Sequence, residues 1–140
     1  PEAFSSKESY IASLAASNYD LLIIDAYYGD SMLTPQDVAR LQYKPGGSRR
    51  LVASYMSVGE AEDYRPYWQS QWGTNPPDWM WIANGDWEGN YRVRYWSKEW
   101  QKMLMGSPQS YLDQILAAGF DGAFLDVIDV FYVFEDIANQ

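Results

Sequence analysis

Three short apolar runs constrain the fold of this chain more than any other feature. They occupy residues 21–24, 51–56 and 122–125, and the first and third are followed directly by an acid, Asp25 and Asp126. Continuous apolar character without alternation is typical of parallel strands that are covered on both faces. We therefore expect an α/β protein whose parallel strands are buried on both sides and end in carboxylates.

Helical patterns alternate with these runs. Ser5 and Glu8 have the spacing of a capping box, which predicts a helix start. The pairs at 34–35 and 107–108 each place a cap residue before proline, which suits the first helical position. Gly119 predicts the end of the last helix. The order helix, strand, helix, strand, insert, helix, strand predicts parallel pairing through right-handed crossovers.

A long insert, residues 58–95, separates the second and third runs. All seven tryptophans lie between Trp68 and Trp100, within and just after this insert. Connections of this length are uncommon in compact domains and are often functional. We expect most indoles to pack against the sheet and two or three to be exposed as platforms for sugar rings. No linker separates a second domain, so residues 1–140 are predicted to form a single domain that contains the insert.

Composition excludes several classes of site. The chain has no cysteine and no histidine, which removes thiolate chemistry, Ser-His triads and ordinary zinc sites. A net charge of −9 disfavours nucleic acid and acidic membranes as partners, and favours a neutral or cationic ligand. No apolar run approaches the roughly 18 residues of a membrane span. No calcium-loop pattern is present, so we expect neither a metal nor another cofactor.

Asp126 is the foremost candidate for catalysis. Ligands of parallel α/β folds bind beyond the carboxyl ends of the strands, where this acid is expected to lie. An ionised carboxylate there can act as a nucleophile or stabilise an oxocarbenium ion. The alternative is a structural aspartate that accepts hydrogen bonds from nearby backbone amides.

Other acids are expected at the same rim. Asp129 is a candidate sugar ligand, second carboxylate or cap of a following turn. Asp25 is expected to hold substrate or to orient a neighbour. Glu60 follows a glycine that permits a sharp turn, and Glu62 and Asp63 are interpreted as solvated loop charges or caps. Converging carboxylates raise one another's pKa values, which acid–base chemistry exploits.

Three long motifs resemble those of one known family. They are SYMSVGEAEDYR at residues 54–65, WEGNYRVRYW at 87–96 and GFDGAFLDVID at 119–129. In this order they resemble the second-strand, following and fourth-strand motifs of glycoside hydrolase family 114, whose members include endo-α-1,4-polygalactosaminidases. The resemblance extends over nearly the whole chain.

The resemblance implies a TIM-type barrel, of which this chain would hold about three strands, and cleavage of galactosamine-rich polysaccharide by two carboxylates, often outside the cell. It implies that Asp126 is the nucleophile or charge stabiliser. The residues expected to bind substrate at the rim and in the insert are Asp25, Tyr55, Glu60, Asp129, Trp87 and Tyr91.

Against the family pattern, the chain begins after the first strand and stops after the fourth, so the second acid is expected elsewhere. Three strands leave two open edges, which a second copy in a homodimer would complete. Two alternatives to an enzyme therefore stay open: a non-catalytic glycan-binding module, and a structural half-barrel that assembles as a dimer.

Overall fold

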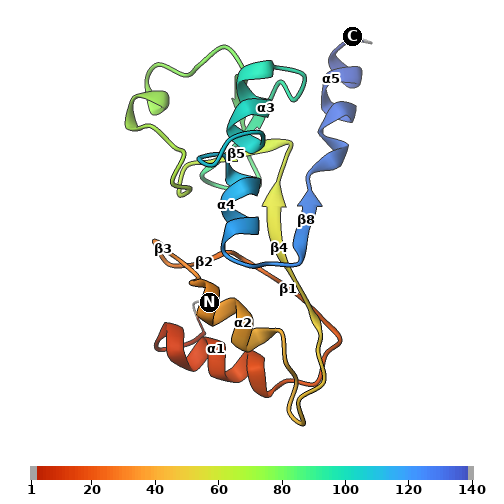
Figure 1. Ribbon diagram of the computed structural model, residues 1–140. Helices are drawn as coiled ribbons and strands as arrows, with labels where there is room; N and C mark the ends of the chain where they lie inside the picture. Colours follow the sequence, from red (N-terminus) through yellow and green to blue (C-terminus); the bar gives the residue numbers. More distant parts are fainter. Residues whose placement is uncertain (1–2, 139–140) are drawn as a thin grey trace. The chain divides into compact units, whose positions relative to one another are not determined.

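The computed structural model describes residues 3–138, and its helices and strands form two compact units (Figure 1). The first unit contains the chain up to residue 56 and residues 112–124; the second contains residues 57–111 and the chain from residue 125. The single domain expected for residues 1–140 stays a prediction.

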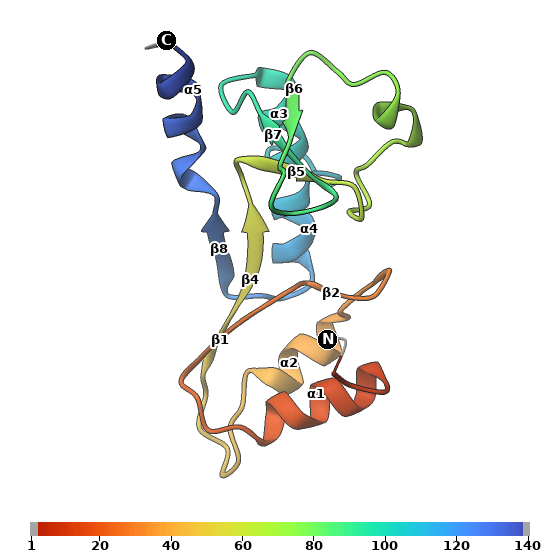
Figure 2. The ribbon, with the colours of Figure 1, turned by 180° about the vertical axis from the view of Figure 1, so that it is seen from behind.

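A parallel sheet is the centre of the first unit. Its strands are β1 (Leu21–Ile24), β4 (Leu51–Ser57) and β8 (Gly122–Asp126), in the order β1-β4-β8. Strands β1 and β4 pair in parallel, with Leu21 opposite Leu51. Figure 2 shows β4 and β8 running in the same direction. The three predicted strands and their parallel arrangement are thereby confirmed.

The helices alternate with these strands along the chain, as predicted. Helix α1 (Lys7–Ala16) precedes β1, α2 (Pro35–Leu41) precedes β4, and α4 (Tyr111–Ala117) precedes β8. A short antiparallel pair, β2 (Tyr27–Tyr28) and β3 (Ser31–Met32), follows β1.

Helix starts were predicted well at one position and less well at two others. Thr34 caps α2 and Pro35 is its first residue, as expected. The cap of α1 is Ser6, which forms a capping box with Ser9, so the assignment of Ser5 and Glu8 was wrong. Helix α4 begins at Tyr111, three residues beyond the predicted proline start.

Arg50 joins the ends of two helices in the first unit. Its guanidinium is buried and donates to the carbonyl oxygens of Leu14 at 3.0 Å, Ser17 at 3.0 Å and Leu41 at 2.6 Å. These carbonyls lie at the ends of α1 and α2, where no further helical turn satisfies them. A cation there also complements the helix dipoles.

The sheet is open on one side in the described part of the chain. Leu22, Ile24 and Val52 are buried, whereas their neighbours Leu21 and Leu51 are about half exposed. Strand side chains alternate between faces, so one face is covered and the other is not. The prediction of burial on both faces was wrong for these strands.

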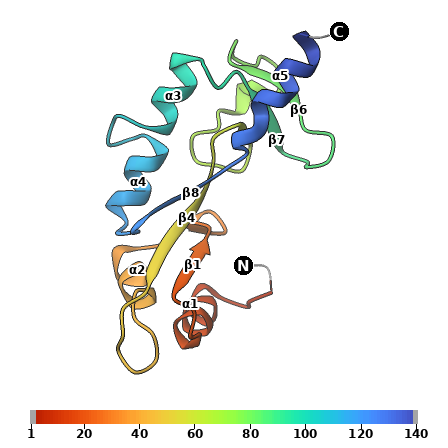
Figure 3. The same cartoon turned by 90° about the vertical axis from the view of Figure 1, so that its right-hand side faces the viewer.

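The second unit contains a sheet that the sequence did not predict. Strands β5 (Glu60–Glu62), β7 (Asn90–Val93) and β6 (Met80–Ala83) pair antiparallel in the order β5-β7-β6. Helix α3 (Lys98–Leu104) and the 3-10 turn η1 (Ser70–Gly73) complete the segment. After β8 the chain passes through the 3-10 turn η2 (Ile128–Val130) into α5 (Phe131–Ala138), as Figure 3 shows.

Aromatic rings in contact with one another form the core of this unit. Trp79 lies 5.1 Å from Trp72 and 5.0 Å from Trp100 between ring centroids, and all three are buried. Trp87 and Trp96 are exposed. The insert is therefore a packed sheet with a few outward indoles rather than a long loop.

Candidate functional site

Glu60 begins strand β5 and is buried, with 5% of its surface exposed. Its backbone N–H donates to the Ser57 hydroxyl at 3.2 Å, and its Oε1 accepts from the Asn84 side-chain amide at 2.8 Å. Arg92 lies opposite it in the β5-β7 register. The Asn84 amide therefore holds this carboxyl directly, and the sheet places Arg92 on the neighbouring strand.

Burial raises the pKa of Glu60 above its ordinary value of 4.5. The hydrogen bond from Asn84 and the charge of Arg92 lower the pKa, but they do not outweigh burial. The charges of Glu62 and Asp126 raise the pKa further, so Glu60 senses the carboxylate of Asp126. A buried carboxyl with a raised pKa thus lies within electrostatic reach of a second acid in this unit, an arrangement that acid–base sites use.

A pocket of about 340 Å³ opens beside Glu60. It brings together three of the predicted substrate residues, Glu60, Asp129 and Trp87. The residues that also line it are Asn84, Arg92, Val127, Val130, Tyr132 and Val133. Acids, an amide, a cation and exposed rings around one cavity suit a polar ligand with flat apolar faces.

Asp126 is the last residue of β8, where the sequence placed it, and its side chain is half-buried. Its backbone carbonyl accepts from the Val58 N–H at 3.1 Å. Val127 follows with φ 57°, and the chain then enters η2. Asp129 lies inside η2 and is exposed, whereas Val127 occupies the cap position, so the cap alternative for Asp129 was wrong.

Two predicted site residues belong to the first unit. Asp25 is half-buried, and its Oδ1 accepts from the Tyr27 N–H at 2.8 Å, which closes the turn after β1. Tyr55 is half-buried within β4. Their contribution to substrate binding stays a prediction.

Tyr91 lies next to Arg92 on β7, and consecutive strand residues point to opposite faces. Its ring packs on Trp68 with centroids 4.9 Å apart, and it is not among the residues that line the 340 Å³ pocket. Its contact with substrate stays a prediction.

Sequence reasoning missed Asn84, Arg92 and Tyr132 as lining residues. Because Arg92 and Arg94 alternate with apolar residues, the sequence indicates an extended segment whose arginines are structural partners of loop acids, but it does not name the acid. Only the pairing of β7 with β5 places it opposite Glu60.

The sequence suggested that Glu62 is a solvated loop charge, and this prediction was wrong. It is 1% exposed, and its Oε2 accepts from Arg65 Nε at 2.6 Å. The Tyr64 hydroxyl donates to its Oε1 at 2.6 Å. Glu62 therefore holds the segment after β5 together and does not line the 340 Å³ pocket.

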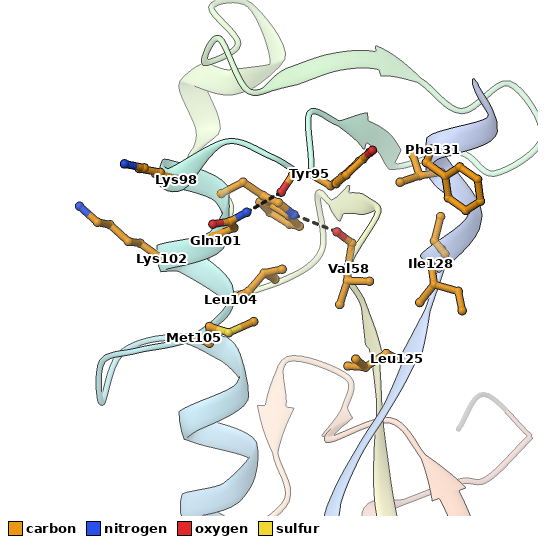
Figure 4. A pocket seen from close by; sticks show the side chains of 13 residues that line it. Val58, Tyr95, Lys98, Gln101, Lys102, Leu104, Met105, Leu125, Ile128 and Phe131 are labelled. Atoms are coloured by element: carbon orange, nitrogen blue, oxygen red, sulfur yellow. Dashed lines mark hydrogen bonds between the residues drawn. The ribbon is translucent and has the colours of Figure 1, made fainter. Parts of the chain in front are cut away.

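A larger apolar pocket of about 760 Å³ lies between α3 and the segment from the end of β8 into α5 (Figure 4). Leu104, Met105, Leu125, Ile128 and Phe131 are among its lining residues. The Trp100 indole N–H donates to the Val58 carbonyl at 2.9 Å in its wall. Lys98, Gln101 and Lys102 of α3 add polar groups to this mainly apolar lining.

Two classes of site find no support in the described part of the chain. Residues 3–138 contain no group of three or more His, Cys, Asp or Glu placed to hold a metal ion. No helix among them is long and apolar enough to cross a membrane.

Comparison with known proteins identifies the family. Residues 5–140 match the sequence pattern of glycoside-hydrolase family GH114. The chain belongs to this family. The resemblance of its three motifs to this family is thereby confirmed. The acids of β5 and β8 therefore belong to a chain of a glycoside-hydrolase family.

Two relatives are described as uncharacterised proteins. One from Methanocaldococcus jannaschii is 39% identical over 133 residues, which are 92% of this chain and 36% of the relative. One from Thermotoga maritima is 45% identical over 124 residues, which are 84% of this chain and 35% of the relative. The chain thus spans little more than a third of these relatives.

A solved structure is also similar. The crystal structure of Aspergillus fumigatus Ega3 in complex with galactosamine matches with a TM-score of 0.59 and 25% identity, over 85% of this chain and 43% of that chain. The match supports the α/β fold, and the Ega3 structure contains the amino sugar galactosamine.

Proposed function

We propose that the protein containing this chain hydrolyses an amino-sugar polysaccharide of the polygalactosamine type, with Asp126 as nucleophile or stabiliser of the oxocarbenium ion. One observation carries the proposal: Asp126 ends the parallel strand β8, the chain turns directly after it, and Asp129 then lines a polar pocket together with the buried carboxyl of Glu60. Family membership and the galactosamine bound by Ega3 support the substrate class.

The pocket residues have distinct proposed roles. Glu60 has a raised pKa, so it can accept from a sugar hydroxyl or ammonium when ionised and donate when protonated. Asp129 adds a second acidic contact for a cationic amino sugar. Trp87, 69% exposed, offers an indole face on which the C–H face of a sugar ring can stack. Asp25, Tyr55 and Tyr91 complete the proposed substrate contacts.

Hydrolysis by two carboxylates needs a proton donor as well as Asp126. Asp126→Asn keeps the size and shape of the side chain but removes its charge. We expect wild-type protein to release oligosaccharides from polygalactosamine and the variant to release almost none. Unchanged turnover in Asp126→Asn would remove Asp126 from the mechanism.

A non-catalytic glycan-binding module is the second candidate. It is favoured by the exposure of aromatic rings at the pocket, since Tyr132 is 59% exposed in addition to Trp87. This function predicts binding of galactosamine oligosaccharides without release of products. Binding calorimetry combined with product analysis separates the two candidates.

Two further proposals concern setting and assembly. A polymeric substrate suggests action outside the cell, which secretion assays of the protein test. The open face of β1 and β4 suggests a homodimer that covers it, and sedimentation over a range of concentrations tests that proposal.

A further inference from the structure

Val127 adopts a backbone conformation that valine normally avoids. Its φ of 57° and ψ of 34° lie in the left-handed region, and among residues 3–138 it is the one non-glycine residue with positive φ. A β-branched side chain in this region is strained. Such strain persists only where surrounding structure enforces it, and it concentrates at functional sites. Here it directly follows Asp126.

Gly59 supplies the surface that Val127 packs against. A Cβ atom at position 59 would overlap the carbonyl oxygen of Val127 and lie 2.8 Å from Cβ of Val130. Gly59 has no positive φ, so the glycine is required by this close approach and not by the sharp turn expected from sequence.

The segment around Gly59 is itself firmly held. The Gly59 carbonyl accepts from the Val93 N–H at 3.1 Å, which ties it to β7. The Val58 carbonyl accepts from the Trp100 indole at 2.9 Å, which ties it to α3. The Val58 N–H donates to the Asp126 carbonyl at 3.1 Å, so the same segment also fixes the end of β8.

The left-handed residue determines where two acids lie. An extended residue at 127 would prolong β8, whereas the observed conformation turns the chain at once into η2. As a result Asp126 remains at the strand end while Asp129 lines the pocket with Glu60. We infer that Val127 and Gly59 are positioning residues that set the Asp126 and Asp129 carboxylates for catalysis, an inference that rests on the proposed function.

The test compares three variants of the full-length protein. Asn adopts the left-handed region readily, so Val127→Asn should lower kcat less than Val127→Gly does. Gly permits many other conformations, so Val127→Gly should lower kcat about tenfold and also raise KM, because Asp129 is a proposed substrate contact. Gly59→Ala should lower kcat by a similar factor, while the control Gly73→Ala, which has open space around it, should not.

Amide hydrogen exchange gives a readout that does not depend on activity. Because the Val58 N–H is bonded to Asp126, its exchange should accelerate about tenfold in Val127→Gly and stay unchanged in Val127→Asn. Wild-type kcat together with wild-type Val58 exchange in Val127→Gly would overturn the inference. If the wild-type protein releases no oligosaccharide, the proposed function fails, and Val58 exchange alone still decides whether Val127 fixes the strand end.

Discussion

Arg65 donates from Nε to Oε2 of Glu62 at 2.6 Å, and the side chains of both residues are almost fully buried. This ion pair lies in the same sequence motif as Glu60. Glu62 is two residues after Glu60, but its function is structural. Glu62 is closed off from the pocket and supports the segment, whereas Glu60 lines the pocket.

Loss of one partner from this pair should be severe. Arg65→Ala leaves the Glu62 carboxylate buried without its cation, which typically costs about 3–5 kcal/mol. Denaturant unfolding measures this cost. The control is Arg40→Ala, which breaks the exposed pair between Arg40 and Glu8 and should cost less than about 1 kcal/mol. Equal losses in the two variants would contradict a stabilising role for the buried pair.

Glu60→Gln should stabilise the protein at neutral pH. Folding raises the pKa of Glu60, so its favourable contribution is present below its ordinary value of 4.5 and is lost as pH rises through the folded-state pKa. Gln cannot ionise and can still accept from Asn84. The expected gain is about 1 kcal/mol or less at pH 7, roughly 3 °C in melting temperature.

The pH dependence is the deciding feature of that comparison. The advantage of Glu60→Gln should shrink as pH falls from the raised folded-state pKa toward the ordinary value of 4.5, and it should be lost at lower pH, where the wild-type carboxyl is protonated in both states. A melting-temperature difference that is constant between pH 4 and 8 would show that ionisation of Glu60 does not cost stability.

Asp121 should show the opposite dependence. Burial alone would raise its pKa, but the Val52 N–H at 2.9 Å and Arg49 at 2.7 Å outweigh burial and hold the pKa below 3.8. Its contribution is therefore present above pH 3.8 and lost as pH falls through the folded-state pKa. Asp121→Asn should cost about 1 kcal/mol at pH 7 by thermal unfolding, and this cost should shrink as pH falls below 3.8.

Trp87→Ala should weaken binding of galactosamine oligosaccharides about tenfold, because it removes the exposed indole face beside the pocket. Calorimetric titration measures the affinity, and the melting temperature should hardly change. Trp96→Ala is the matched control: Trp96 is also exposed, but it packs on Phe134 at 4.8 Å and is not among the residues that line the pocket. Similar losses in both variants would argue against a specific platform at Trp87.

The parallel strands were predictable because their signal is local. Residues 21–24 form an uninterrupted apolar run, and the observed β1 has the same bounds. The cap of α1 was misplaced because Ser5 and Ser6 are equally good candidates by type, and only the reach to Ser9 decides between them.

Long-range pairing limited what the sequence could reveal of the site. Asp126 and Glu60 were placed at strand ends from pattern alone. Arg92 lies opposite Glu60 because of the β5-β7 register, which pairs residues about thirty positions apart in the sequence. The left-handed backbone conformation of Val127 could not be predicted, since valine by itself favours extended structure. Glu62 was misread because glutamate is rarely buried unless paired.

Replacement of two aspartates near the same strand tests the central claim most directly. Asp126 ends β8, and Asp121 precedes it as a structural acid. The account predicts that Asp126→Asn keeps its melting temperature and loses at least about a thousandfold in kcat on polygalactosamine, while Asp121→Asn loses stability and keeps kcat at a temperature where it is folded. Wild-type kcat in Asp126→Asn would contradict the account.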